Sequence, residues 1–88
     1  MGSYNIVVSP RVDKDLRKLP KNIIKTISLV IDGLAKNPRP DGCKKLRGAH
    51  VEEYRVKAKR DYRVLYQVYD KEKIIHVLRV LDRKEAYR

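Results

Sequence analysis

The sequence predicts an α+β domain in which a two-helix hairpin packs on one face of a mainly antiparallel four-stranded sheet. Three observations support this fold class. A β-branched run opens the chain, two stretches with helical spacing of apolar residues follow it, and three strand-like stretches complete it. The order β-α-α-β-β-β is typical of helices that form one layer against a sheet. We expect residues 1–88 to form a single domain, because chains of this length rarely divide.

The N-terminal part is predicted to form a strand and then two helices. Residues 4–9, YNIVVS, are rich in β-branched residues and predict the strand. Ser9 and Pro10 are typical of a helix start, because serine caps the first turn and proline suits the first helical position. Pro20 breaks or restarts the helix. Apolar residues spaced by three and four mark one face of each helix: Val12, Leu16 and Leu19, then Ile23, Ile27, Val30, Ile31 and Leu34.

The C-terminal part is predicted to contain the other three strands. Residues 36–42, KNPRPDG, end the second helix because they hold two prolines and a glycine. Residues 44–48, KKLRG, then lead to a strand that begins near Tyr54. The remaining strands are expected at residues 62–69 and 74–81, with a turn near residues 70–73 between them.

Charge is the strongest feature of the composition. Twenty-two lysines and arginines against eleven acids give a net charge of +11, which predicts a polyanionic partner such as nucleic acid, the ribosome, a membrane surface or an acidic protein. No stretch approaches the roughly 18 apolar residues that span a membrane. The single cysteine, Cys43, excludes an internal disulfide, and two histidines make no convincing metal site. We therefore expect a cytoplasmic protein without a metal or small-molecule cofactor.

The hairpin predicted between residues 54 and 69 could pair in two registers. With Lys57 opposite Tyr62, the cations would share a face with the tyrosines. With Lys57 opposite Arg63, the apolar residues gather on one face, and burial favours this register because a one-residue slip reverses every side chain. Like charges directly opposite each other destabilise a sheet by a few tenths to about 1 kcal/mol. An unfavourable pair of this kind is expected where the residues form a binding site.

The face with Lys57 and Arg63 is a candidate phosphate-binding patch, to which Arg55 belongs and which Arg79 or Arg83 could border. The alternative is an ordinary solvated surface, on which lysine and arginine are common. Arginine binds phosphate through two parallel hydrogen bonds, and lysine binds it as a point charge. The patch could also cleave RNA, whose 2′-hydroxyl needs only a base, a charge stabiliser and an acid. Lys57 is the candidate base, because neighbouring cations favour its neutral form.

Three segments follow one another in a characteristic order: LRG, EYRVKAKRDYRVLYQVYD and IIHVLRVLDRKEAYR. Together with KDLRKLP and LAKNPRPDG, they resemble the RelE/ParE superfamily of toxins from bacterial and archaeal toxin–antitoxin pairs. The resemblance covers nearly the whole chain and implies one RelE-like toxin domain over residues 1–88. It also implies a RelB-like antitoxin encoded beside the toxin.

The two branches of this superfamily imply different activities. RelE-type members cleave mRNA in the ribosomal A site without a metal, by 2′-hydroxyl attack that leaves a cyclic phosphate and a free 5′-hydroxyl. ParE-type members share the fold, inhibit DNA gyrase and lack the ribonuclease cluster. The cluster favours the RelE type, with the ribosome, its rRNA and mRNA as partners. A ParE-like gyrase inhibitor is the alternative, and a basic nucleic-acid-binding module without activity is a third reading.

The resemblance implies a catalytic set of four residues. Lys57 is the expected base, Arg63 the stabiliser of the transition state, Arg83 the group that protonates or assists the leaving oxygen, and Tyr87 the residue that orients or stacks on the substrate. The spacing from Arg83 to Tyr87 is shorter than in some members.

The remaining expected RNA contacts come from four more basic residues. Arg55 is expected to hold the phosphate backbone, because it stands where the best-known pattern has lysine and arginine cannot act as a base. Lys59 and Arg60 are expected at the hairpin tip, in contact with rRNA or only with solvent. Arg79 is expected at the border of the patch.

Overall fold

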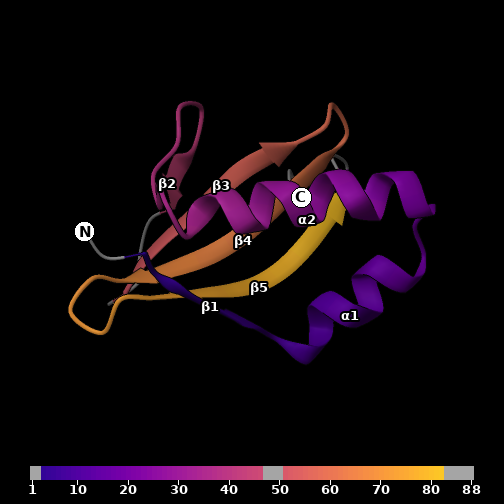
Figure 1. Cartoon of the computed structure of the whole chain (residues 1–88). Coiled ribbons are helices and arrows are strands. Elements are labelled where there is room, and N and C mark those ends of the chain that lie inside the picture. Colours follow the sequence, from indigo (N-terminus) through magenta and orange to yellow (C-terminus); the bar gives the residue numbers. More distant parts are fainter. Residues whose placement is uncertain (1–2, 47–50, 83–88) are drawn as a thin grey trace.

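The computed structural model describes residues 3–46 and 51–82. Its elements in chain order are β1 (Asn5–Val8), α1 (Pro10–Arg17), α2 (Lys21–Leu34), β2 (Lys44–Leu46), β3 (Glu52–Ala58), β4 (Tyr62–Tyr69) and β5 (Ile74–Asp82). The strands form one sheet in the order β1-β5-β4-β3-β2. Strand β1 runs parallel to β5, and the other neighbours are antiparallel. Both helices lie against one face of this sheet (Figure 1).

The predicted α+β class is confirmed, but the sheet has five strands where the sequence predicted four. The additional strand is β2, which pairs antiparallel with β3 at the edge of the sheet. Its three residues, KKL, are too few to show a period of two, and two of them are charged. Pairing with β3 therefore makes this segment a strand, and its own propensity does not.

The predicted helix boundaries follow from local chemistry. Ser9 caps α1, since its hydroxyl accepts a hydrogen bond from the Arg11 amide at 3.3 Å, and Pro10 begins the helix. Pro20 precedes α2, as predicted. None of the helices in the described residues is long and apolar enough to cross a membrane.

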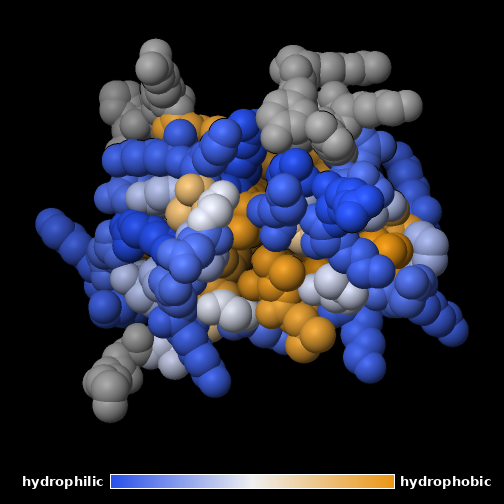
Figure 2. All heavy atoms as spheres, turned by 90° about the horizontal axis from the view of Figure 1, so that it is seen from above, coloured by the Kyte–Doolittle hydropathy of each residue, from blue (hydrophilic) through white to orange (hydrophobic). Residues whose placement is uncertain are grey.

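The core lies between the helices and the sheet. The apolar stripes predicted for the helices all belong to it: Val12, Ile27, Ile31 and Leu34 are buried, and Leu16, Leu19, Ile23 and Val30 pack partly buried against them. The strands contribute alternate residues, among them Tyr54, Val56, Val64 and Tyr66. Seen from above in the orientation of Figure 2, hydrophilic side chains surround a strip of apolar ones.

The predicted register of the β3–β4 hairpin is confirmed. Lys57 lies opposite Arg63, and Tyr54 lies opposite Tyr66. The apolar residues therefore face the helices, and the cations of these strands face the other side. A register shift between Leu65 and Tyr66 interrupts the pairing of β4 with β5, which is typical of a β-bulge.

Candidate functional site

The cations of the open sheet face line one pocket, which we call the cation pocket. It has a volume of about 370 Å³, and its lining residues are Asp41, Gly42, Lys44, Arg55, Val56, Lys57 and Arg63. Three neighbouring strands supply the cations, because Lys44 lies opposite Arg55 and Lys57 lies opposite Arg63. The structure thus brings together Arg55, Lys57 and Arg63, as the sequence predicted.

Lys44 is a pocket residue that sequence reasoning missed. Two adjacent lysines, Lys44 and Lys45, precede β3, and nothing in their spacing distinguishes them. The register of β2 on β3 does, since Lys44 pairs with Arg55 and Lys45 pairs with Tyr54. Lys44 therefore shares the face of the cations, and Lys45 does not.

Arg63 is the most constrained cation of the pocket. Only 6% of the residue is exposed, and it is the one buried charged residue in the ranges that the structure describes. Its Nη1 donates to the Tyr62 carbonyl at 3.0 Å and to the Arg60 carbonyl at 3.3 Å. Lys57, on the partner strand, is exposed. The pocket therefore combines a guanidinium held by the backbone with an exposed lysine side chain, an arrangement suited to binding a phosphate diester.

The other predicted contacts lie at different places. Lys59 and Arg60 are exposed in the turn between β3 and β4, where Lys59 has a left-handed backbone with φ of 55°. Arg55 is partly exposed beside Lys57. Arg83 and Tyr87 lie outside the described residues.

Arg79 is turned toward helix α1, so the structure does not bring it to the cation pocket. Its Nε and Nη2 donate to the two carboxylate oxygens of Asp15, both at 2.9 Å. The Val80 amide donates to the same carboxylate at 3.0 Å. The register shift in β4–β5 pairing lies next to Leu65, the partner of Arg79, and a bulge re-aims nearby side chains. The pair ties α1 to β5.

We expect Asp15→Asn to lower the free energy of unfolding at neutral pH. We also expect this free energy to fall less steeply in the variant than in the wild type as the pH is lowered. Burial acts to raise the pKa of the Asp15 carboxyl, but the hydrogen bonds from Arg79 and Val80 outweigh it and leave the pKa below its ordinary value. Because the folded-state pKa is depressed, this stabilisation is present above the unfolded pKa of about 3.9 and is lost as the pH falls through the folded pKa. Urea unfolding at several pH values measures the effect.

The control for this prediction is Asp13→Asn, which removes an exposed carboxylate from the same helix. If the free energy of unfolding of Asp15→Asn fell with decreasing pH as steeply as that of the wild type, the role of the ion pair would be contradicted.

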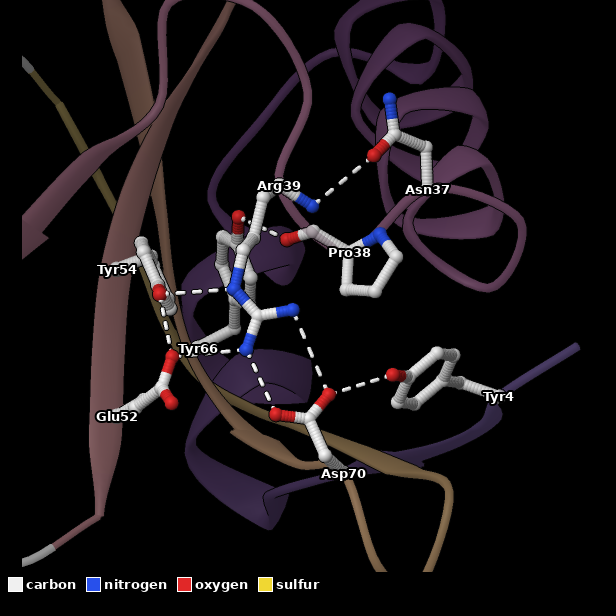
Figure 3. A network of polar contacts seen from close by, with 8 residues as sticks. All are labelled: Tyr4, Asn37, Pro38, Arg39, Glu52, Tyr54, Tyr66 and Asp70. Atoms are coloured by element: carbon white, nitrogen blue, oxygen red, sulfur yellow. Dashed lines mark hydrogen bonds and ion pairs between the residues drawn. The ribbon is translucent and has the colours of Figure 1, made fainter.

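A second polar network, centred on Arg39, lies on the helix side of the sheet (Figure 3). Arg39 Nε donates to the Tyr54 hydroxyl at 2.9 Å, and Nη2 donates to Glu52 and to Asp70, each at 2.8 Å. The Tyr4 hydroxyl donates to Asp70 at 2.6 Å. Sequence reasoning missed Arg39, because residues 36–42 showed only a loop.

This network changes the acidity of its members. Hydrogen bonds from Tyr54 and Arg39 lower the pKa of Glu52, and hydrogen bonds from Arg39 and Tyr4 lower the pKa of Asp70. Burial and the hydrogen bond to Glu52 raise the pKa of the Tyr54 hydroxyl. Both carboxylates are therefore ionised and Tyr54 is neutral near pH 7, so two negative charges more than neutralise the Arg39 guanidinium on this side of the sheet.

Comparison with known proteins assigns the chain to a family. Residues 6–87 match the model of the ParE toxin of the type II toxin–antitoxin system parDE. A Methanocaldococcus jannaschii protein named RelE1 is 34% identical over 97% of this chain and 96% of its own length.

Solved structures agree with this assignment. The archaeal RelE–RelB complex from Pyrococcus horikoshii contains a chain with a TM-score of 0.82 and 32% identity, over 92% of this chain and 96% of that one. The RelBE toxin–antitoxin complex of E. coli contains one with a TM-score of 0.74 and 28% identity, over 89% and 94%. The chain therefore belongs to the RelE/ParE superfamily of toxins of type II toxin–antitoxin systems.

Proposed function

We propose that this toxin is a ribosome-dependent mRNA endoribonuclease that cleaves in the A site and so inhibits translation. The observation that supports it most is the pairing of Lys57 with Arg63 across β3 and β4, in one pocket with Arg55. An inert surface gains nothing from like charges set opposite each other, because their repulsion costs stability. A phosphate bound between them offsets that repulsion.

The proposed reaction uses the nucleophile of the RNA itself. Neutral Lys57 takes the proton from the 2′-hydroxyl, and the 2′-oxygen attacks the adjacent phosphorus. The bond from phosphorus to the 5′-oxygen breaks, and that oxygen receives a proton. The products are a 2′,3′-cyclic phosphate and a free 5′-hydroxyl. The reaction is a transesterification, so it consumes no water and needs no oxidant or reductant.

Each remaining residue has a role in this scheme. Arg63 stabilises the charge that develops on the phosphoryl oxygens, since its backbone bonds hold it in place before the reaction. Arg83 protonates or assists the leaving oxygen, and Tyr87 orients or stacks on the substrate; both roles rest on the family resemblance. Arg55 holds the phosphate backbone. Lys59 and Arg60, exposed at the hairpin turn, contact rRNA.

The ribosome supplies what a small pocket lacks. An ordinary lysine is almost fully protonated near neutral pH and so is rarely available as a base. Bending the mRNA into line can contribute several kcal/mol to lowering the barrier. We infer also that a RelB-like antitoxin neutralises the toxin, because the related chains in the archaeal and E. coli structures are in complexes with RelB. An acidic segment that folds on contact suits a surface with a net charge of +11.

A translation extract tests the proposal. We expect the purified toxin to cut a reporter mRNA at the A-site codon of stalled ribosomes, with 5′-hydroxyl ends on the downstream fragments, mapped by primer extension. The family model that matches the chain describes ParE, so gyrase supercoiling is assayed in parallel. Inhibited supercoiling with intact mRNA would overturn the proposal and establish the gyrase inhibitor instead.

A further inference from the structure

We propose that Arg39 is a positioning residue for the cation pocket: it anchors the loop before β2 and thereby holds Lys44 in place to bind the RNA phosphates. The inference rests on the proposed function, because it assigns roles within the same site. Arg39 itself lies on the helix side of the sheet, beside Tyr54, whereas the pocket cations point to the other side. Its effect on the pocket must therefore pass through the loop.

Arg39 connects its loop to separate parts of the fold. Its guanidinium bonds to Tyr54 and Glu52 on β3 and to Asp70, which directly follows β4. The guanidinium carbon also lies 5.5 Å from the centre of the Tyr54 ring. A planar fork with fixed donors reaches these acceptors together, which the single ammonium of lysine cannot do with the same geometry.

The neighbouring loop residues are anchored as well. The Tyr66 hydroxyl donates to the Pro38 carbonyl at 2.7 Å, and Tyr66 is fully buried. The Arg39 amide donates to the Asn37 side chain at 3.2 Å. The chain therefore leaves the core at Pro38 and Arg39 along a defined path (Figure 3).

A tight turn transmits this anchoring to β2. The Cys43 amide donates to the Pro40 carbonyl at 3.1 Å, and Gly42 has φ of 87°. A positive φ at the third position is what a type II turn requires, and glycine adopts it without strain. Asp41 and Gly42 line the pocket, and Lys44 begins β2 directly after the turn. Only four residues thus separate Arg39 from Lys44.

Strand β2 depends on this anchoring because it is short and lies at the edge of the sheet. It has three residues, and within residues 3–46 and 51–82 its one neighbouring strand is β3. Isolated pairings of this length are marginal in water, so the position of β2 depends on what holds its ends. Without Arg39, the loop would sample more conformations, and the Lys44 ammonium would spend less time over the pocket.

The cysteine beside the turn offers a direct measurement of the anchoring. Cys43 is the only cysteine of the chain and is partly buried against the core. We expect Arg39→Gln to speed modification of the Cys43 thiol by a maleimide at least about tenfold, because labelling follows local opening of the loop. The labelling rate of Cys43 in Arg39→Lys is expected to lie between the rates in Arg39→Gln and in the wild type. Arg11→Gln, at an exposed position of α1, removes the same charge and is expected to leave the labelling rate of Cys43 unchanged.

Kinetics of cleavage then connect the loop to the pocket. We expect Arg39→Gln and Lys44→Met each to raise KM for ribosome-bound mRNA about 5- to 20-fold, as for one lost charge-assisted contact, with kcat nearly unchanged. Lys44→Met should not change labelling of Cys43. The Arg39→Gln/Lys44→Met double variant should have the same KM as Lys44→Met alone, because both substitutions remove the same contact between Lys44 and the RNA phosphates. Lys45→Met, the neighbour on the other face of β2, is expected to leave KM unchanged.

Different failures have different meanings. Unchanged Cys43 labelling in Arg39→Gln, with circular dichroism confirming a folded protein, would overturn the anchoring. Additive KM effects in the double variant would overturn the path through Lys44. Should Arg39→Gln not fold, Arg39→Lys decides the same comparisons. A wild-type protein that does not cleave mRNA refutes the proposed function and with it the role of Lys44 in that reaction, whereas labelling still decides whether Arg39 holds the loop.

Discussion

Replacing Lys57 with methionine is expected to lower the rate of mRNA cleavage by about 10²- to 10⁴-fold, the usual contribution of a positioned acid–base group. Methionine keeps the aliphatic stem and removes the nitrogen, so the packing of β3 should be retained. Lys57 is exposed, which argues against a large change in stability. Single-turnover cleavage of mRNA on stalled ribosomes measures the effect.

The matched control is Lys71→Met, which removes one exposed positive charge from the turn between β4 and β5. It should cleave at the wild-type rate. Full cleavage by Lys57→Met would rule out Lys57 as the base. Undiminished growth inhibition by Lys57→Met without any mRNA cleavage would point to the gyrase alternative.

Replacing Tyr66 with alanine is expected to lower the free energy of unfolding by about 3–5 kcal/mol, the usual cost of removing a large aromatic ring from a core. Tyr66 is fully buried, and its ring stacks on Tyr54 with 5.7 Å between the ring centres. Domains of this size are stable by only about 5–15 kcal/mol, so the variant should be close to unfolding at physiological temperature. Chemical denaturation measures the change.

Two further variants separate the contributions of Tyr66. Tyr66→Phe keeps the ring and loses the hydrogen bond to the Pro38 carbonyl, which should cost about 1–3 kcal/mol because the carbonyl loses its partner. Tyr69→Ala removes a partly exposed ring from the same strand and should cost less than Tyr66→Ala. A loss below about 1 kcal/mol in Tyr66→Ala would show that the core tolerates this cavity.

Much of the fold was predictable because local pattern and burial agree. The apolar spacing of both helices, the Ser9–Pro10 start of α1 and the break at Pro20 are local signals, and the structure confirms them. The hairpin register was also predictable, because only one of the two registers buries Tyr54 and Val56 with Val64 and Tyr66. The shared face of Lys57, Arg63 and Arg55 follows from that register.

The sequence by itself determined the α+β class, the helix faces and the shared face of Arg55, Lys57 and Arg63, since these depend on periodicity within segments and on the one hairpin register that buries the apolar residues. Only the tertiary structure decided the places of β2, Arg79 and Arg39. Strand β2 exists through its pairing with β3, Arg79 joins Asp15 from a helix more than sixty residues earlier, and Arg39 reaches partners 13 to 31 residues away. Contacts between distant segments leave no period in the sequence, because each partner alone has the appearance of an ordinary surface charge.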